Sequence, residues 1–145
     1  MSGTAYFLWL AEQGWSGVMY FPRVSVAIWV LPLLAFVVLR PFRRPDAGRI
    51  GVWSAVPFGI PVLLLLVGTV LHSVGGPTTA FQGPRSGLGI LLITGLLVSQ
   101  LGFAGLFSRR FRDLSAYVSA LTVAQLWISL WFAFAALVSV TGEGP

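Results

Sequence analysis

The residue whose type most readily suggests chemistry is His72, the one histidine of the chain. Gly68, Gly75 and Gly76 share its side of an expected helix, at a spacing of about 100° per residue. Small residues beside a histidine allow a flat macrocycle such as haem or chlorophyll to approach closely, and one axial histidine suffices for a chlorophyll. The alternative is a histidine at the membrane surface that bonds only to water or lipid headgroups.

The acidic residues offer little for catalysis, because the chain has only four. Glu12 borders an apolar segment, where an ionisable group inside the membrane would mark a functional site; a solvated carboxylate at the surface is the simpler interpretation. We expect Asp46 and Asp113 to pair with neighbouring arginines. The sequence has no paired carboxylates in an apolar segment, no metal-ligand cluster, no phosphate-binding loop and no serine with a base. It therefore predicts a protein that is not an enzyme, holds no metal and requires no cofactor.

The overall composition favours a membrane as the solvent. Hydrophobic residues make up 57% of the 145 residues and charged residues 9%, whereas soluble domains carry about 25% charged residues. Cysteine is absent, which excludes disulfides and thiol chemistry. Nucleic-acid binding has no domain to support it.

Four apolar stretches approach the length of about 20 residues that a bilayer core about 30 Å thick requires. They predict an all-α integral membrane protein, a single domain of residues 1–145, with transmembrane helices at 21–40, 52–74, 88–107 and 114–140 in an up-down bundle. Bound lipids are expected. Pro32, Pro57 and Pro61 lie inside these helices, where we expect kinks.

Residues 4–20 mix apolar and polar side chains, with Glu12 and Gln13 in the middle. The segment is typical of an amphipathic helix that lies in the membrane interface, anchored by Trp9 and Trp15. A re-entrant element that pairs with the first transmembrane helix is the alternative.

The arginines predict the topology. Most of them lie in loops 40–49 and 109–112, while the loop between the second and third helices holds only Arg85. Under the positive-inside rule both arginine-rich loops are cytoplasmic and both termini lie outside. A bacterial cytoplasmic membrane is the expected location.

Two helices carry small or polar stripes that suggest helix packing. Gly95, Ser99 and Gly102 form one stripe on helix 88–107, and Gln100 projects from the far side. Helix 114–140 has two separate stripes. One consists of small residues and continues into Trp127 and Trp131; its members are Ala116, Ala120 and Ala124. The other consists of polar residues: Ser115, Thr122, Gln125 and Ser129. The hydroxyls could instead bond carbonyls of their own helix, but Gln100 and Gln125 are expected to face another helix.

These features favour a small non-catalytic subunit of a larger respiratory, photosynthetic or transport complex, which acts by packing against other membrane proteins. The alternative is a homo-oligomeric channel or small transporter, in which a polar path runs along one helix. The residues that would line this path are Ser115, Thr122, Gln125 and Ser129. A third possibility is a subunit that contacts haem, chlorophyll or a quinone through His72.

Overall fold

The computed structural model describes residues 3–40, 45–75 and 84–141, and all the regular elements of this part are helices. The elements, in chain order, are α1 (Gly3–Tyr20), α2 (Pro22–Leu39), α3 (Ala47–Ala55), the 3-10 turn η2 (Val56–Phe58), α4 (Gly59–Gly75), α5 (Pro84–Arg110), the 3-10 turn η3 (Arg112–Leu114) and α6 (Ser115–Thr141).

Four of the helical stretches are long and apolar enough to cross a membrane: Pro22–Leu39, Ala47–Leu71, Gly87–Arg110 and Arg112–Val140. This confirms the predicted all-helical fold with four stretches that could span a membrane. The second stretch begins earlier than the predicted start at residue 52, because Ile50 is fully buried and its N–H already bonds to the carbonyl of Asp46.

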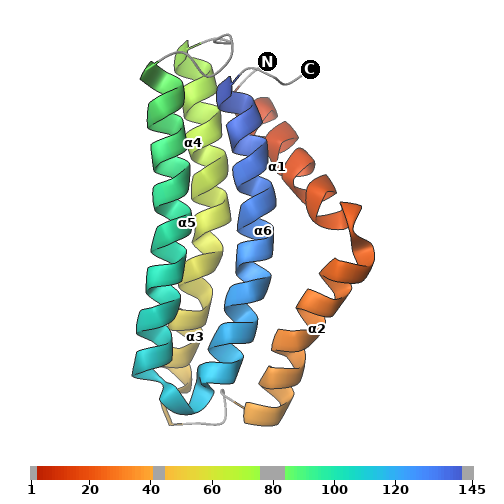
Figure 1. Cartoon of the computed structure of the whole chain (residues 1–145), viewed down its shortest axis with the longest axis vertical. Helices are drawn as coiled ribbons and strands as arrows, with labels where there is room; N and C mark the ends of the chain where they lie inside the picture. Colours follow the sequence, from red (N-terminus) through yellow and green to blue (C-terminus); the bar gives the residue numbers. More distant parts are fainter. Residues whose placement is uncertain (1–2, 41–44, 76–83, 142–145) are drawn as a thin grey trace.

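Helix α6 is the central element, since it packs against α1, α2, α4 and α5 (Figure 1). Helices α4 and α5 also pack against each other, so α4, α5 and α6 form a compact group of three. Helices α1 and α2 together form a bent arm that follows α6 on its other side. The fold is thus less regular than the predicted four-helix bundle, in which each helix would expose one face to lipid.

The arm runs antiparallel to α6. Near its start, the Tyr6 hydroxyl donates a hydrogen bond of 2.7 Å to Ser139 Oγ, and beyond the bend Trp127 Nε1 donates one of 3.1 Å to Ser25 Oγ. The bend lies at Phe21, whose φ of −113° and ψ of 73° leave the helical region, just before Pro22 starts α2. Proline is favoured in the first helical turn because that turn needs no N–H partner.

The position of α1 along the membrane normal can be estimated from the rise of helix α6. A rise of about 1.5 Å per residue puts Phe132 about 30 Å from Arg112 along α6, which is the thickness of a hydrocarbon core. A Cβ added at Gly14 of α1 would lie 2.9 Å from the Phe132 ring, so Gly14 is at this level. If the arginines mark one boundary, the first half of α1 lies in the opposite interface. The interfacial placement of residues 4–20 stays a prediction.

Of the three buried apolar clusters among the described residues, two join α3 or α4 to α5 and α6, and the third, of Leu10, Leu65 and Ala135, joins α1 to α4 and α6. The lower cluster, at the end of the bundle where α5 ends, consists of Ile50, Phe107, Leu114, Tyr117, Val118 and Leu121. The upper cluster consists of Ile60, Leu64, Ile93, Ala133 and Ala136. Close packing of α4 on α6 in the upper half depends on Gly68, where an added Cβ would lie 3.1 Å from Ala136 Cα.

Candidate functional site

Buried polar side chains separate the lower and upper apolar clusters. We call this group the polar layer; it consists of Ser54, Gln100, Gln125 and Ser129, all of which are buried. Along each of α5, α6 and the broken helix from α3 to α4, the polar residue or residues stand between a residue of the lower cluster and a residue of the upper cluster. Gln100 lies about 14 Å from Arg109 along α5, near the middle of a core about 30 Å thick.

The polar layer coincides with a break in the second membrane-crossing stretch. Helix α3 ends at Ala55, and the turn η2 that follows contains Pro57, which has no N–H to continue the helical ladder. The Ser54 carbonyl accepts a hydrogen bond of 3.1 Å from Gln125 Nε2 of α6. Tyr117 of α6 also donates a bond of 3.3 Å to Ser54 Oγ. Gln125 and Tyr117 therefore tie α6 to the end of α3.

Hydrogen-bonding capacity remains unused in this layer. The side-chain nitrogen and oxygen of Gln100 and the hydroxyl of Ser129 are buried, and none of them has a hydrogen-bond partner among the described residues. Each such group costs about 1–3 kcal/mol when it is buried without a partner. The layer is therefore polar and incompletely hydrogen-bonded, and apolar clusters lie above and below it.

The structure brings together only part of the predicted polar path. Gln125 and Ser129 point into the layer, whereas Ser115 is exposed and Thr122 donates a 2.7 Å bond to the Val118 carbonyl of its own helix. The sequence analysis did not identify Ser54 as part of the site. Pro57 was the signal that could have found it, because a break in a helix leaves carbonyls that another helix can bond.

Both stripes of α6 are occupied by elements of the same chain. Gln125 bonds to α3, and the stripe that ends in Trp127 and Trp131 faces α2 and α1, with Gly17 packed against the Trp131 ring. Along this stripe Ala116 is exposed, Ala120 is half-buried and Ala124 is buried. The two faces of α6 therefore do not by themselves require a partner subunit.

The stripe on α5 faces away from the bundle. Gly95, Ser99 and Gly102 are all exposed, and an added Cβ at Gly95 or Gly102 would meet nothing within 4 Å. The Ser99 hydroxyl donates to the Leu96 carbonyl of its own helix at 2.7 Å. The stripe is thus free of contacts with the rest of the described chain.

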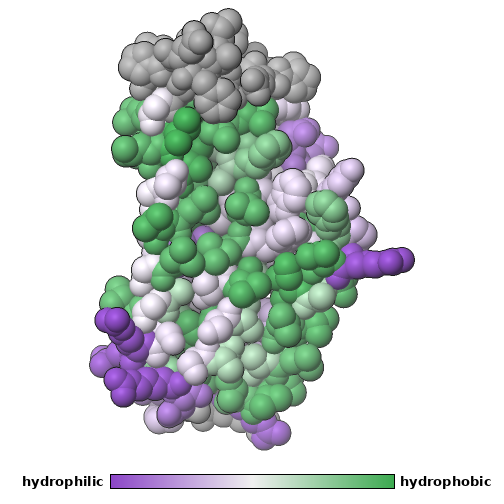
Figure 2. Space-filling model, in the orientation of Figure 1, coloured by the Kyte–Doolittle hydropathy of each residue, from purple (hydrophilic) through white to green (hydrophobic). Residues whose placement is uncertain are grey.

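An apolar groove of about 430 Å³ opens between α2 and α5 and over α6; its lining includes Ile28, Val98, Leu101, Val123 and Trp127, and it does not include the stripe residues. It exists because α2 packs on α6 but diverges from α5. The space-filling view shows hydrophobic surface over much of this face, with hydrophilic surface at the lower end, where α5 ends, and on the right side, including a projection at mid-height (Figure 2).

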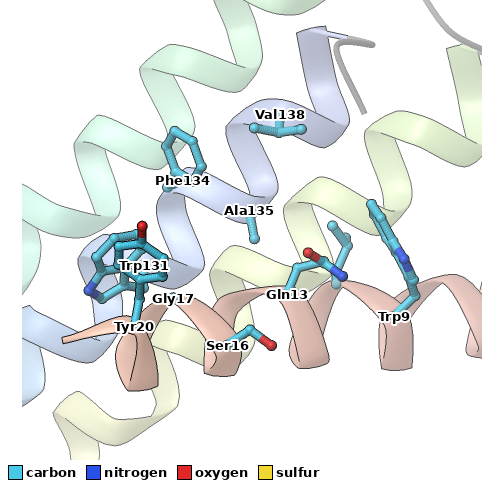
Figure 3. Close-up of a pocket in the computed structure, with 10 residues that line it drawn as sticks. Trp9, Gln13, Ser16, Gly17, Tyr20, Trp131, Phe134, Ala135 and Val138 are labelled. Carbon is cyan, nitrogen blue, oxygen red and sulfur yellow. The ribbon is translucent and has the colours of Figure 1, made fainter. Parts of the chain in front are cut away.

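A second groove of about 370 Å³ lies between α1 and α6. Gln13 projects into it from α1, between the Trp9 ring and the overlapping rings of Tyr20 and Trp131 (Figure 3). The Trp131 indole nitrogen is buried without a hydrogen-bond partner in the described part of the chain. Aromatic and neutral polar side chains of this kind suit the level of the membrane interface.

The remaining candidates add no cofactor site to this picture. The side chain of His72 lies outside the described residues, so its role as a haem or chlorophyll ligand stays a prediction. Glu12 is exposed on α1. Within the described residues, no group of three or more His, Asp or Glu side chains could hold a metal ion.

Comparison of the chain with protein-family models, with curated proteins and with solved structures gives no match.

Proposed function

We propose that the chain is a non-catalytic subunit of a larger membrane complex and that it acts by packing against a transmembrane helix of another membrane protein. The observation that carries this proposal is the exposed stripe of Gly95, Ser99 and Gly102 on α5. Small residues on a helix surface allow a second helix to approach closely, and such stripes are enriched at helix interfaces in membranes.

No contact within the described chain requires a glycine at position 95 or 102. Glycine inside a helix is less favourable than alanine by about 1 kcal/mol, and an alanine at Gly95 or Gly102 would meet no other atom within 4 Å. Gly68 and Gly89 differ, since an added Cβ there would contact Ala136 and Val140 respectively. A helix of another protein is the occupant that matches the stripe, because small residues let a second helix approach closely.

The test uses glycine variants together with site-specific photocrosslinking. A photocrosslinking residue in place of Val98, which lines the groove, is expected to give an adduct with a different membrane protein. The same residue in place of the exposed Leu63 of α4 is the control and is expected to crosslink only lipid. Mass analysis identifies the adduct.

Gly102→Leu is expected to remove the Val98 adduct without lowering the unfolding temperature of the purified chain, since the new side chain meets nothing in the chain. Gly68→Leu is the matched variant that should lower the unfolding temperature, because it clashes with Ala136. Adducts only with lipid at Val98, or an adduct that persists in Gly102→Leu, would contradict the proposal. Adducts only with a second copy would replace it by a homo-oligomer.

The second candidate is a channel or small transporter, and the unpartnered Gln100 and Ser129 favour it. Broken helices near the membrane midplane commonly form binding sites in transporters. Passage would require the lower and upper clusters to open in turn. If this function holds, reconstituted vesicles should show a solute permeability that Gln100→Leu abolishes.

We further propose that the chain lies in a bacterial cytoplasmic membrane with loops 40–49 and 109–112 on the cytoplasmic side. The support is the distribution of arginines, most of which lie at one end of the membrane-crossing stretches.

A further inference from the structure

A polar cavity of about 370 Å³ lies at the lower end of the bundle, on the surface between the start of α3 and the turn from α5 to α6. Four arginines and two aspartates line it: Arg49, Arg109, Arg110, Arg112, Asp46 and Asp113. They come from two segments of the chain, 46–49 and 109–113. The positive-inside rule requires these arginines to lie on one side of the membrane, but it does not require them to converge on one cavity.

The charge of the cavity fits an anion. Four arginines and two aspartates leave a net charge of 4 − 2 = +2. Arginine presents its N–H groups in a planar fork that matches two oxygens of a phosphate, so several arginines around one space favour a phosphate group over a simple halide.

The position of the cavity selects a lipid as the source of that phosphate. One membrane-crossing stretch begins at Ala47, another ends at Arg110, and a third begins at Arg112. The cavity therefore lies where three of the four stretches reach the headgroup region. Basic pockets between helices at this level suit the headgroups of anionic lipids.

We propose that this cavity binds the headgroup of an anionic phospholipid, with a preference for cardiolipin, whose two phosphodiesters match the net charge of +2. The site is separate from the packing surface on α5, and the inference does not depend on the proposed function.

The test measures lipid binding to the full chain in detergent by native mass spectrometry. Cardiolipin should bind more tightly than phosphatidylglycerol, and phosphatidylcholine should bind weakest. Arg49→Gln and Arg110→Gln should each weaken cardiolipin binding about five-fold, and the double variant about thirty-fold, which corresponds to about 1 kcal/mol per basic residue at an anionic surface.

Arg23→Gln is the matched control, because it removes the same charge but Arg23 lies at the start of α2, away from this end of the bundle; it should leave binding unchanged. Asp46→Asn should tighten binding, and it costs no helix cap because Asp46 makes no side-chain capping bond to α3. This variant keeps the test informative if an arginine variant does not fold.

Three results would overturn the proposal. The first is an equal loss of binding in Arg23→Gln, which would indicate attraction to net charge alone. The second is full competition by millimolar inorganic phosphate, which would make the cavity a site for a free anion. The third is equal binding of cardiolipin and phosphatidylcholine.

Discussion

The two interior glutamines belong to one polar layer but differ in their hydrogen bonding. Gln125 donates to the Ser54 carbonyl, whereas neither amide atom of Gln100 has a partner among the described residues. We therefore expect opposite effects of substitution by leucine. Gln100→Leu should raise the free energy of unfolding by about 1–2 kcal/mol, because it removes an unsatisfied buried group. Gln125→Leu should lower it by about 1 kcal/mol, because it leaves the carbonyl unpaired.

Reversible unfolding of the purified chain in mixed micelles, followed by circular dichroism, would measure both changes. Thr122→Val serves as a control, since the Thr122 hydroxyl bonds only to its own helix, and it should change the free energy by less than either glutamine variant. A loss of stability in Gln100→Leu would mean that a bound molecule already satisfies this amide in solution.

The sequence predicts the interior orientation of these glutamines but not their partners. A carboxamide is costly against lipid, so its residue type alone indicates a helix-facing position. The partner of Gln125 depends on where the second membrane-crossing stretch breaks and on how α3 is rotated against α6. Neither follows from the sequence around residue 125.

At the scale of the element, the contact between α1 and α6 depends on two glycines of α1. An added Cβ at Gly17 would clash with the Trp131 ring, and one at Gly14 would lie 2.9 Å from the Phe132 ring. Gly17→Leu should therefore separate α1 from α6. Overpacking of this kind costs about 1–3 kcal/mol, and we expect faster proteolysis within α1.

Limited proteolysis with mass analysis of the fragments would detect the release of α1. Gly105→Leu on α5 is the control, since nothing lies within 4 Å of the added Cβ. If Gly17→Leu resists protease as well as Gly105→Leu does, α1 is held by contacts other than the close approach at Gly17.

The prolines show how far an element can be predicted from its residues. Pro57 coincides with a break, as expected, because α3 gives way to a 3-10 turn there. Pro32 lies inside α2, which continues through it from Pro22 to Leu39. The sequence gives the same signal at both positions. Both prolines are buried, so burial does not distinguish them. At Pro57 a side chain from another helix stabilises the break, because Gln125 bonds the neighbouring Ser54 carbonyl.

At the scale of the whole molecule, the central position of α6 means that the surface expected to meet a partner lies on α5 and not on α6. The sequence suggests that α6 meets neighbours on two sides, and the chain itself supplies them: α4 and α5 on one side, α1 and α2 on the other. Helix α5 is peripheral, so its small-residue stripe is left outward. Hydrophobic periodicity could not predict this arrangement, because every helix is apolar on most of its surface and the order of packing depends on contacts between distant segments.

The start of α1 and the end of α6 lie near one end of the molecule, and the turn from α5 to α6 lies at the other (Figure 1). This separation allows a direct test of topology. The chain has no cysteine, so a single introduced cysteine reports one position without background. Thr4→Cys at the start of α1 should react with a membrane-impermeant maleimide added to intact cells. Gly48→Cys lies next to Arg49 and has open space around its Cβ. It should react only after the cells are opened, because the positive-inside rule keeps the arginines in the cytoplasm.

Labelling of both variants in intact cells would contradict a crossing of the membrane between the two positions. Labelling of Gly48→Cys alone in intact cells would show the opposite orientation.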